Sequence, residues 1–175
     1  VNGKLDKDLL KDSVQTGIRM LDNVIDINFY PTVEAENSNF KHRPIGMGIM
    51  GLQDALFKCN LSFESPKALN FSDQLMEFIS YNAIEYSSEL AKERGSYETF
   101  KGSKWDRGIF PLDSLTMLEE ERGDHIDVNK ITSMDWEELK EKVKKHGMRN
   151  SNTMAIAPTA TISNIAGCFP CIEPI

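Results

Sequence analysis

Apolar residues recur at helical spacing in the first part of the chain. Residues 7–25 carry an apolar side chain every three or four positions, which predicts an amphipathic helix. These positions are Leu9, Leu10, Val14, Ile18, Leu21 and Ile25. A longer helix should begin at Ser65-Pro66, since Ser65 can cap free amides and Pro66 suits the first helical position. It should end near Gly95.

A third helix is predicted near the end of the chain by its charge pattern. Residues 135–146, DWEELKEKVKKH, place acids first and bases last. The helix dipole favours this order. Gly147 follows and should end the helix. We expect irregular loops over residues 31–43 and 96–134.

Two short apolar runs predict buried strands. Residues 44–51, PIGMGIMG, are interrupted by glycines and lead into a helix over about 52–58. Residues 152–157, NTMAIA, lead into a helix over about 159–165. Strands that alternate with helices are typical of the α/β class with parallel pairing. Two strands are too few to close a sheet.

Composition and charge exclude several classes of function. The 175 residues suffice for one domain with a core, and the net charge is −7. No basic stripe is present, which argues against nucleic-acid binding. No run approaches the roughly 18 apolar residues of a membrane span. Three cysteines, an odd number, do not predict a disulfide framework, so we expect a reducing, cytoplasmic setting.

The glycines at 46, 48 and 51 match the spacing G-x-G-x-x-G. A dinucleotide site needs them in the turn after a strand, with an acid about 20 residues further on. Here they lie inside the apolar run, and a polar stretch precedes them. Close backbone packing, where only glycine leaves room, is the alternative interpretation.

Cys168 and Cys171 form a C-x-x-C pair. A redox dithiol usually starts a helix, where the helix N-terminus lowers the thiol pKa, but this pair follows the predicted helix start by several residues. A zinc site would need two more ligands. The remaining candidates lack ligand spacing, so we predict no metal site: Cys59, His42, His125 and His146.

Small and hydroxylated residues follow the second predicted strand. Ala157-Pro158-Thr159-Ala160-Thr161-Ile162-Ser163 leads from the strand into a helix. Free amide groups at a helix N-terminus favour an anion, and the hydroxyls can add donors. The small Ala160 would let a phosphate approach the backbone. An ordinary helix cap explains the same residues, so local chemistry leaves both interpretations open.

Three ordered motifs give the chain a family resemblance. They are LDNVIDINFYP at 21–31, HRPIGMGIMGLQDALFK at 42–58, and RNS at 149–151 followed by AIAPTATISNIAGC and IEP. The sequence resembles the catalytic large subunit of ribonucleotide reductase over essentially all of its length. The resemblance implies that residues 1–175 are one segment of a ten-stranded α/β barrel, with PIGMGIMG and NTMAIA as two of its strands.

The resemblance also implies a role for the loop after the second strand. In the family this loop holds the substrate diphosphate through backbone amides and hydroxyls. We therefore predict that a ribonucleoside diphosphate binds at Pro158, Thr159, Ala160, Thr161 and Ile162, with Ser163 as a secondary candidate. The glycines at 46, 48 and 51 become packing positions.

The family reduces ribonucleotides to deoxyribonucleotides for DNA synthesis by thiyl-radical chemistry. The resemblance places the radical cysteine, its Asn and Glu neighbours and the radical-transfer tyrosines outside this chain, so we predict no catalytic residue in it. Cys59, Cys168 and Cys171 do not match the catalytic cysteines. The radical source would be a dimetal small subunit in class I, which GLQDALFK favours, or adenosylcobalamin in class II. The complete large subunit should form a homodimer.

Three hypotheses remain at this point. The chain is a segment of a ribonucleoside-diphosphate reductase that is inactive alone. Alternatively, it is a non-catalytic nucleotide- or phosphate-binding module derived from that barrel. A thiol oxidoreductase that uses Cys168 and Cys171 is the third.

Overall fold

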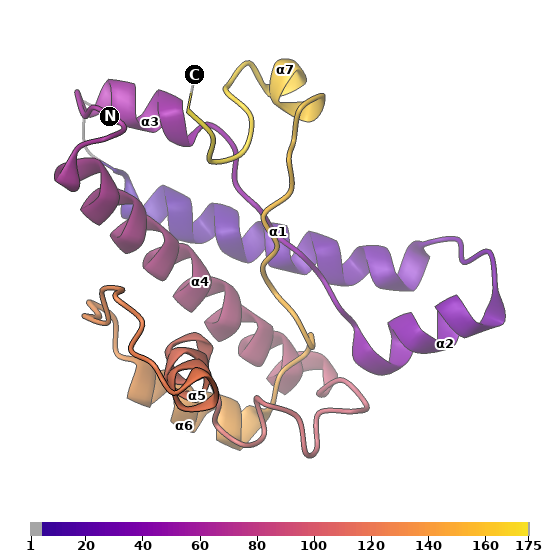
Figure 1. Cartoon of the computed structure of the whole chain (residues 1–175). Coiled ribbons are helices and arrows are strands. Elements are labelled where there is room, and N and C mark those ends of the chain that lie inside the picture. Colours follow the sequence, from indigo (N-terminus) through magenta and orange to yellow (C-terminus); the bar gives the residue numbers. More distant parts are fainter. Residues whose placement is uncertain (1–4, 175) are drawn as a thin grey trace.

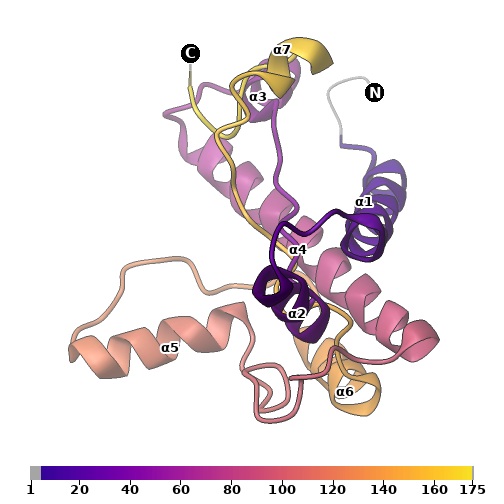
Figure 2. The same ribbon diagram turned by 90° about the vertical axis from the view of Figure 1, so that its right-hand side faces the viewer.

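The computed structural model describes residues 5–174, which form seven helices and one isolated parallel β-bridge. The helices are α1 (Lys7–Ile27), α2 (Val33–His42), α3 (Leu52–Lys58), α4 (Pro66–Arg94), α5 (Pro111–Arg122), α6 (Trp136–His146) and α7 (Ile162–Ala166). The long helix α4 runs through the middle, with α1 on one side and α6 on the other (Figure 1). Helices α3 and α7 lie together at one end, and α5 projects from the rest (Figure 2).

Two apolar cores lie on opposite faces of α4. The first core joins α4 to α1, α3 and the segment around Ile45; its buried members are Val14, Ile18, Ile25, Ile45, Leu52, Leu56, Ala68, Leu75, Ile79, Ala83 and Leu90. The second core joins α4 to α6 and is rich in aromatic residues; its buried members are Tyr81, Ile84, Tyr97, Phe110, Leu139, Val143 and Met148. Because α4 contributes to both, it fixes the position of α1 relative to α6.

The predicted helices α1, α4 and α6 are confirmed, together with the predicted cap at Ser65; Asp6 and Asp135 are further caps. Each begins after a side chain that accepts a hydrogen bond from a free backbone amide. Asp6 accepts from Leu9 N at 3.0 Å, Ser65 from Ala68 N at 3.1 Å, and Asp135 from Glu138 N at 2.9 Å. Helix α4 ends at Gly95, as predicted. Such caps satisfy donors that the first helical turn leaves free.

The predicted loops at 31–43 and 96–134 are partly wrong, because each contains a helix. Neither α2 nor α5 has a buried residue, so neither shows the apolar periodicity that reveals a packed helix. Their end signals are nevertheless present in the sequence. Thr32 caps α2 by accepting from Ala35 N, while α5 starts with Pro111 and ends at Gly123.

The two segments predicted as buried strands pair in parallel over only a few residues and form no strand within residues 5–174; Ile45 is buried, but Ile156 is exposed. Ile45 N donates to Asn152 O, Met47 N donates to Thr153 O, and Ala155 N donates to Met47 O, at 2.9–3.2 Å. One bridge, between Met47 and Met154, results. The parallel pairing of the α/β prediction is therefore confirmed. The ten-stranded barrel is not: within residues 5–174 helices dominate, and no third segment pairs with these two.

Gly46 and Gly48 allow these two segments to approach each other. A Cβ atom on Gly46 would lie 2.7 Å from the Ala155 Cβ, and one on Gly48 would lie 2.7 Å from the Ala155 carbonyl oxygen. Both distances are shorter than side chains tolerate. The close-packing interpretation of these glycines is confirmed, because they lie inside the paired segment and not in a turn after it.

Glu77 on α4 holds the loop that precedes α6. Its carboxylate accepts hydrogen bonds from the Ser133 amide and hydroxyl, from Met134 N at 3.1 Å and from Trp136 Nε1 at 3.0 Å. Partial burial disfavours the charged form, but these donors outweigh it and lower the pKa of Glu77 below its ordinary value of 4.5. The carboxylate therefore stabilises the fold only while it is ionised.

The two glycine contacts predict different responses to substitution. Gly46→Ala and Gly48→Ala should each lower the free energy of unfolding by about 1–3 kcal/mol, because each forces atoms apart in a packed region. Adding Ala155→Gly should restore stability in the Gly46→Ala protein, whose clash is with the Ala155 side chain. It should not rescue Gly48→Ala, whose clash is with a backbone oxygen. Urea unfolding of the four variants tests this, and equal rescue of both would contradict it.

The lowered pKa of Glu77 predicts a pH-dependent effect of Glu77→Gln. At pH 7 this substitution should lower the free energy of unfolding by about 2 kcal/mol, the scale of hydrogen bonds to a charged group. The difference from the parent should shrink as pH falls below the ordinary pKa of 4.5, because Glu77 of the unfolded chain then binds a proton and that of the folded protein follows at lower pH. Unfolding curves between about pH 3 and pH 7 measure this. A difference independent of pH would contradict it.

Candidate functional site

The predicted phosphate loop forms a bend between the second paired segment and α7. Thr159 has φ of +50°, a left-handed conformation that is uncommon outside glycine. Ile162 is the first residue of α7, which has only five residues and starts later than predicted. Pro158, Ala160, Thr161 and Ile162 are exposed, and Thr159 is half-buried. The bend therefore presents backbone to the outside.

Three consecutive amide groups of this bend have no partner within residues 5–174. They belong to the exposed residues Ala160, Thr161 and Ile162; the amide of the half-buried Thr159 before them has no partner in this range either, whereas Ser163 N donates to Thr159 O at 3.0 Å. The Thr159 hydroxyl oxygen accepts from Cys171 N at 2.7 Å, which leaves its hydrogen free to donate. Helix α7 is too short for a large dipole, so these individual donors are what an anion would meet.

Ser163, the secondary candidate, faces inward. It is 1% exposed, and its hydroxyl donates to Ala160 O at 3.3 Å. Asn164 Nδ2 donates to the same carbonyl at 3.1 Å. These bonds shape the bend from inside, so the structure gives Ser163 a framework position instead of a place on the outer surface of the loop.

The segment 168–171 ties the bend to the N-terminus of α3. Phe169 N donates to the Asp54 carboxylate, and Gly51 N donates to Phe169 O, both at 2.8 Å. The Phe169 ring packs edge-on against Phe57. With the bond from Cys171 N to Thr159, these contacts connect the start of the loop to α3 through residues 168–171. Cys168 and Cys171 are free thiols, and Cys171 is buried.

Asp22 forms a buried polar cluster that sequence reasoning missed. Its side chain is fully buried and lies on the face of α1 that packs against the first core. Asp22 Oδ1 accepts from Arg43 Nε at 2.9 Å and from Asn150 Nδ2 at 3.1 Å. Asp22 Oδ2 accepts from Arg94 at 3.1 Å and Arg149 at 3.3 Å. A buried carboxylate needs such partners, because burying an unpaired charge is costly.

The Asp22 cluster extends to its neighbours on both sides. Arg43 also forms a two-pronged ion pair with Asp26, whose pKa is held below its ordinary value mainly by these hydrogen bonds. Asn150 Oδ1 accepts from the Ser87 hydroxyl at 2.9 Å. A carboxylate at a core position of an amphipathic helix was the available sequence signal, since Asp22 follows Val14 and Ile18 at four-residue spacing.

Each of the three family motifs contributes to this cluster. Asp22 belongs to LDNVIDINFYP, Arg43 to HRPIGMGIMG, and Arg149 with Asn150 to the RNS motif. Residues 128 positions apart in sequence, Asp22 and Asn150, are joined by a direct hydrogen bond. All three motifs therefore contribute residues to one buried cluster, which gives a structural reason for their occurring together.

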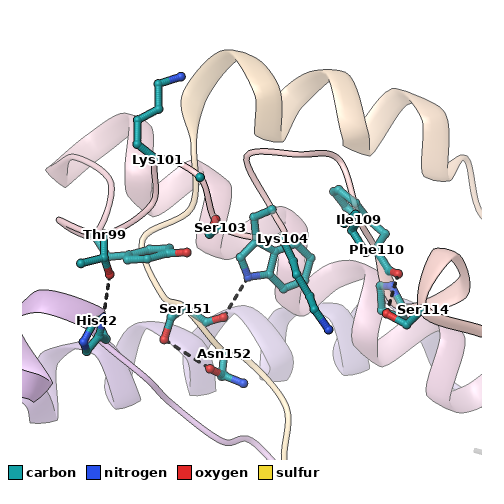
Figure 3. Close-up of a pocket in the computed structure, with 14 residues that line it drawn as sticks. His42, Thr99, Lys101, Ser103, Lys104, Ile109, Phe110, Ser114, Ser151 and Asn152 are labelled. Atoms are coloured by element: carbon teal, nitrogen blue, oxygen red, sulfur yellow. Dashed lines mark hydrogen bonds between the residues drawn. The ribbon is translucent and has the colours of Figure 1, made fainter. Parts of the chain in front are cut away.

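A separate pocket of about 660 Å³ lies at the other end of the paired segments (Figure 3). Its polar groups bond mainly to one another. His42 Nδ1 is 2.6 Å from the Thr99 hydroxyl, Trp105 Nε1 donates to Ser151 O at 2.8 Å, and Lys101 pairs with Asp106. The first two contacts fasten the loop before α5 to His42 and Ser151, while the Lys101–Asp106 pair lies within the loop. None of the lining residues belongs to 158–162.

Residues 5–174 contain no group of three or more His, Cys, Asp or Glu side chains placed to hold a metal ion. None of the helices in the same range has the length and apolarity needed to cross a membrane.

Comparison with known proteins gives a consistent result. The family model described as "Ribonucleotide reductase, barrel domain" matches residues 1–175. The chain is 53% identical to a ribonucleoside-diphosphate reductase subunit alpha from Chlamydia pneumoniae, over 99% of this chain and 17% of that protein. It is 43% identical to the alpha subunit from Helicobacter pylori, over 95% and 21%. It is 42% identical to the large chain from Schizosaccharomyces pombe, over 99% and 20%.

These relatives are much longer than the present sequence. The chain spans about a fifth of the length of the curated relatives it matches, between 16% and 21%. The match nevertheless covers nearly every residue of this chain, including all three motifs. The chain therefore belongs to the ribonucleotide reductase barrel-domain family.

Proposed function

We propose that this chain supplies the substrate diphosphate-binding loop of a ribonucleoside-diphosphate reductase large subunit. The proposal rests on three adjacent amides, those of Ala160, Thr161 and Ile162, which lie on an exposed bend without partners within the described residues. Relatives named as ribonucleoside-diphosphate reductases match the whole segment. The function that the motifs predict and the free backbone donors involve the same residues, 158–162.

The chemistry of the loop suits a diphosphate. Backbone amides donate to phosphate oxygens whatever the side chains are, and the exposed Thr161 hydroxyl can add a donor. Residues 151–175 contain no Lys, Arg or His, so the loop itself offers neutral donors only. Ala160 has a single methyl group and leaves the backbone accessible. Any cation that neutralises the diphosphate would come from another part of the enzyme.

The proposed reaction is completed outside this chain. The family reduces the ribose by radical chemistry, and the radical source, a dimetal small subunit or adenosylcobalamin, belongs in this proposal to the complete enzyme. Within residues 5–174 several large apolar side chains are exposed, among them Ile27, Phe29 and Ile165 at 81–85%. We propose that other segments of the large subunit cover part of this surface, and that the complete subunit forms a homodimer in the cytoplasm.

Ala160→Asp tests the loop assignment. In a complete large subunit that contains this chain, the new carboxylate should repel the diphosphate and raise the apparent KM for a ribonucleoside diphosphate about tenfold or more. Ala160→Asn is the matched control, since it has nearly the same shape without the charge. It should change KM much less. An unchanged KM in the Asp variant would show that the diphosphate binds elsewhere.

The chain alone is expected to be catalytically inactive. Purified residues 1–175 should not convert any ribonucleoside diphosphate, because the radical cysteine and its neighbours lie outside this chain in the family. The same residues, exchanged for the matching segment of a related large subunit, should support turnover when that enzyme's radical source is present. Product analysis by chromatography measures both. An inactive but correctly folded hybrid would favour the non-catalytic module, and turnover by the chain alone would overturn the proposal.

A further inference from the structure

We propose that Asp22 is a positioning residue for the substrate loop. This inference rests on the proposed function of residues 158–162. The two paired segments, of which the first runs into α3 and the second into the loop, both start at the Asp22 cluster. Arg43 directly precedes the first paired segment, and Arg149-Asn150 directly precede the second. One carboxylate thus holds the starting points of both segments.

Asn150 is the link between the two segments. Its Nδ2 donates to Asp22 Oδ1 at 3.1 Å and to the Arg43 carbonyl oxygen at 3.2 Å. Its backbone N donates to the Ser87 hydroxyl at 3.1 Å, and the same hydroxyl donates to Asn150 Oδ1. Asn150 is fully buried. Its position is therefore set simultaneously by α1, by α4 and by the first paired segment.

The two paired segments connect the Asp22 cluster to the loop. They are joined to each other by the backbone bonds between residues 45–47 and 152–155. The glycine contacts with Ala155 leave little space for sliding. At its far end the first segment reaches Gly51, whose amide donates to Phe169 O, while the second runs directly into Pro158. The loop thus follows the second segment directly, and the chain after α7 is held at Phe169 by the end of the first segment.

Apart from the bond from Cys171 N to Thr159 and the inward-facing Ser163, the loop has little packing of its own. Pro158, Ala160, Thr161 and Ile162 are all exposed. A shift of about 1 Å in donors that hold a reacting substrate can cost about a hundredfold in rate. Removing the Asp22 charge leaves Arg43, Arg94 and Arg149 competing for fewer acceptors, so the starting points of both segments should move. The loop should move with them.

The test compares two variants near the cluster with a structural control, in the complete large subunit with its radical source. Asp22→Asn removes the charge, and Ser87→Ala removes only the hydroxyl that holds Asn150. Glu77→Gln is the control, because Glu77 also accepts several hydrogen bonds on α4 but holds the loop 133–136. KM for a ribonucleoside diphosphate, kcat and Tm are measured for each.

If Asp22 positions the loop, the variants should change KM in a way that a loss of stability alone would not. Asp22→Asn should raise KM about tenfold and Ser87→Ala about threefold, whereas Glu77→Gln should lower Tm and leave KM unchanged. If Asp22→Asn does not fold, the KM of Ser87→Ala decides the question. Variants at 22 and 87 that change Tm but not KM would overturn the proposal.

Ala160→Asp, measured in the same series, separates two kinds of failure. If it raises KM while the variants at 22 and 87 do not, the loop assignment stands and the positioning role is wrong. If Ala160→Asp itself leaves KM unchanged, the loop assignment is wrong and the positioning role falls with it.

Discussion

The arrangement of this chain depends on the ion pairs and hydrogen bonds of the buried Asp22 carboxylate. It pairs with Arg43, Arg94 and Arg149, which come from three distant parts of the sequence. Replacing such a cluster by apolar residues can be neutral for stability, but removing one partner from it is costly. Its value here is geometric, since directional hydrogen bonds admit only one placement of α1, α4 and the two paired segments.

Helix α4 extends the effect of the Asp22 cluster to the rest of the described chain. Its C-terminal part supplies Ser87 and Arg94 to the cluster, while its two faces pack into separate cores. The core shared with α1 lies beside the cluster, and the aromatic core shared with α6 is held further by Glu77. A single long helix therefore connects the polar centre of the chain to the packing on both sides.

Sequence patterns predicted the elements whose stability comes from burial. The apolar stripes of α1 and α4 and the charge order of α6 were sufficient, because each reflects contacts made along one helix. Helices α2 and α5 bury nothing and were missed, although Thr32, Pro111 and Gly123 marked their ends. The Asp22 cluster was missed for another reason: its partners are up to 128 residues apart, and local patterns carry no information about such pairs. The role proposed for the loop at 158–162 came from the family resemblance, since its local chemistry also fits an ordinary cap.

The family motifs thus have two different physical bases. Asp22, Arg43, Arg149 and Asn150 contact one another inside the protein and require specific side chains. The loop offers mainly backbone amides, for which few side chains matter beyond small size at Ala160 and a hydroxyl at Thr159. A backbone site cannot adjust by changing a rotamer, so its geometry depends on where the chain enters and leaves it. The two paired segments therefore need specific buried side chains where they start. The loop that follows the second segment depends on few side chains, so these two parts complement each other.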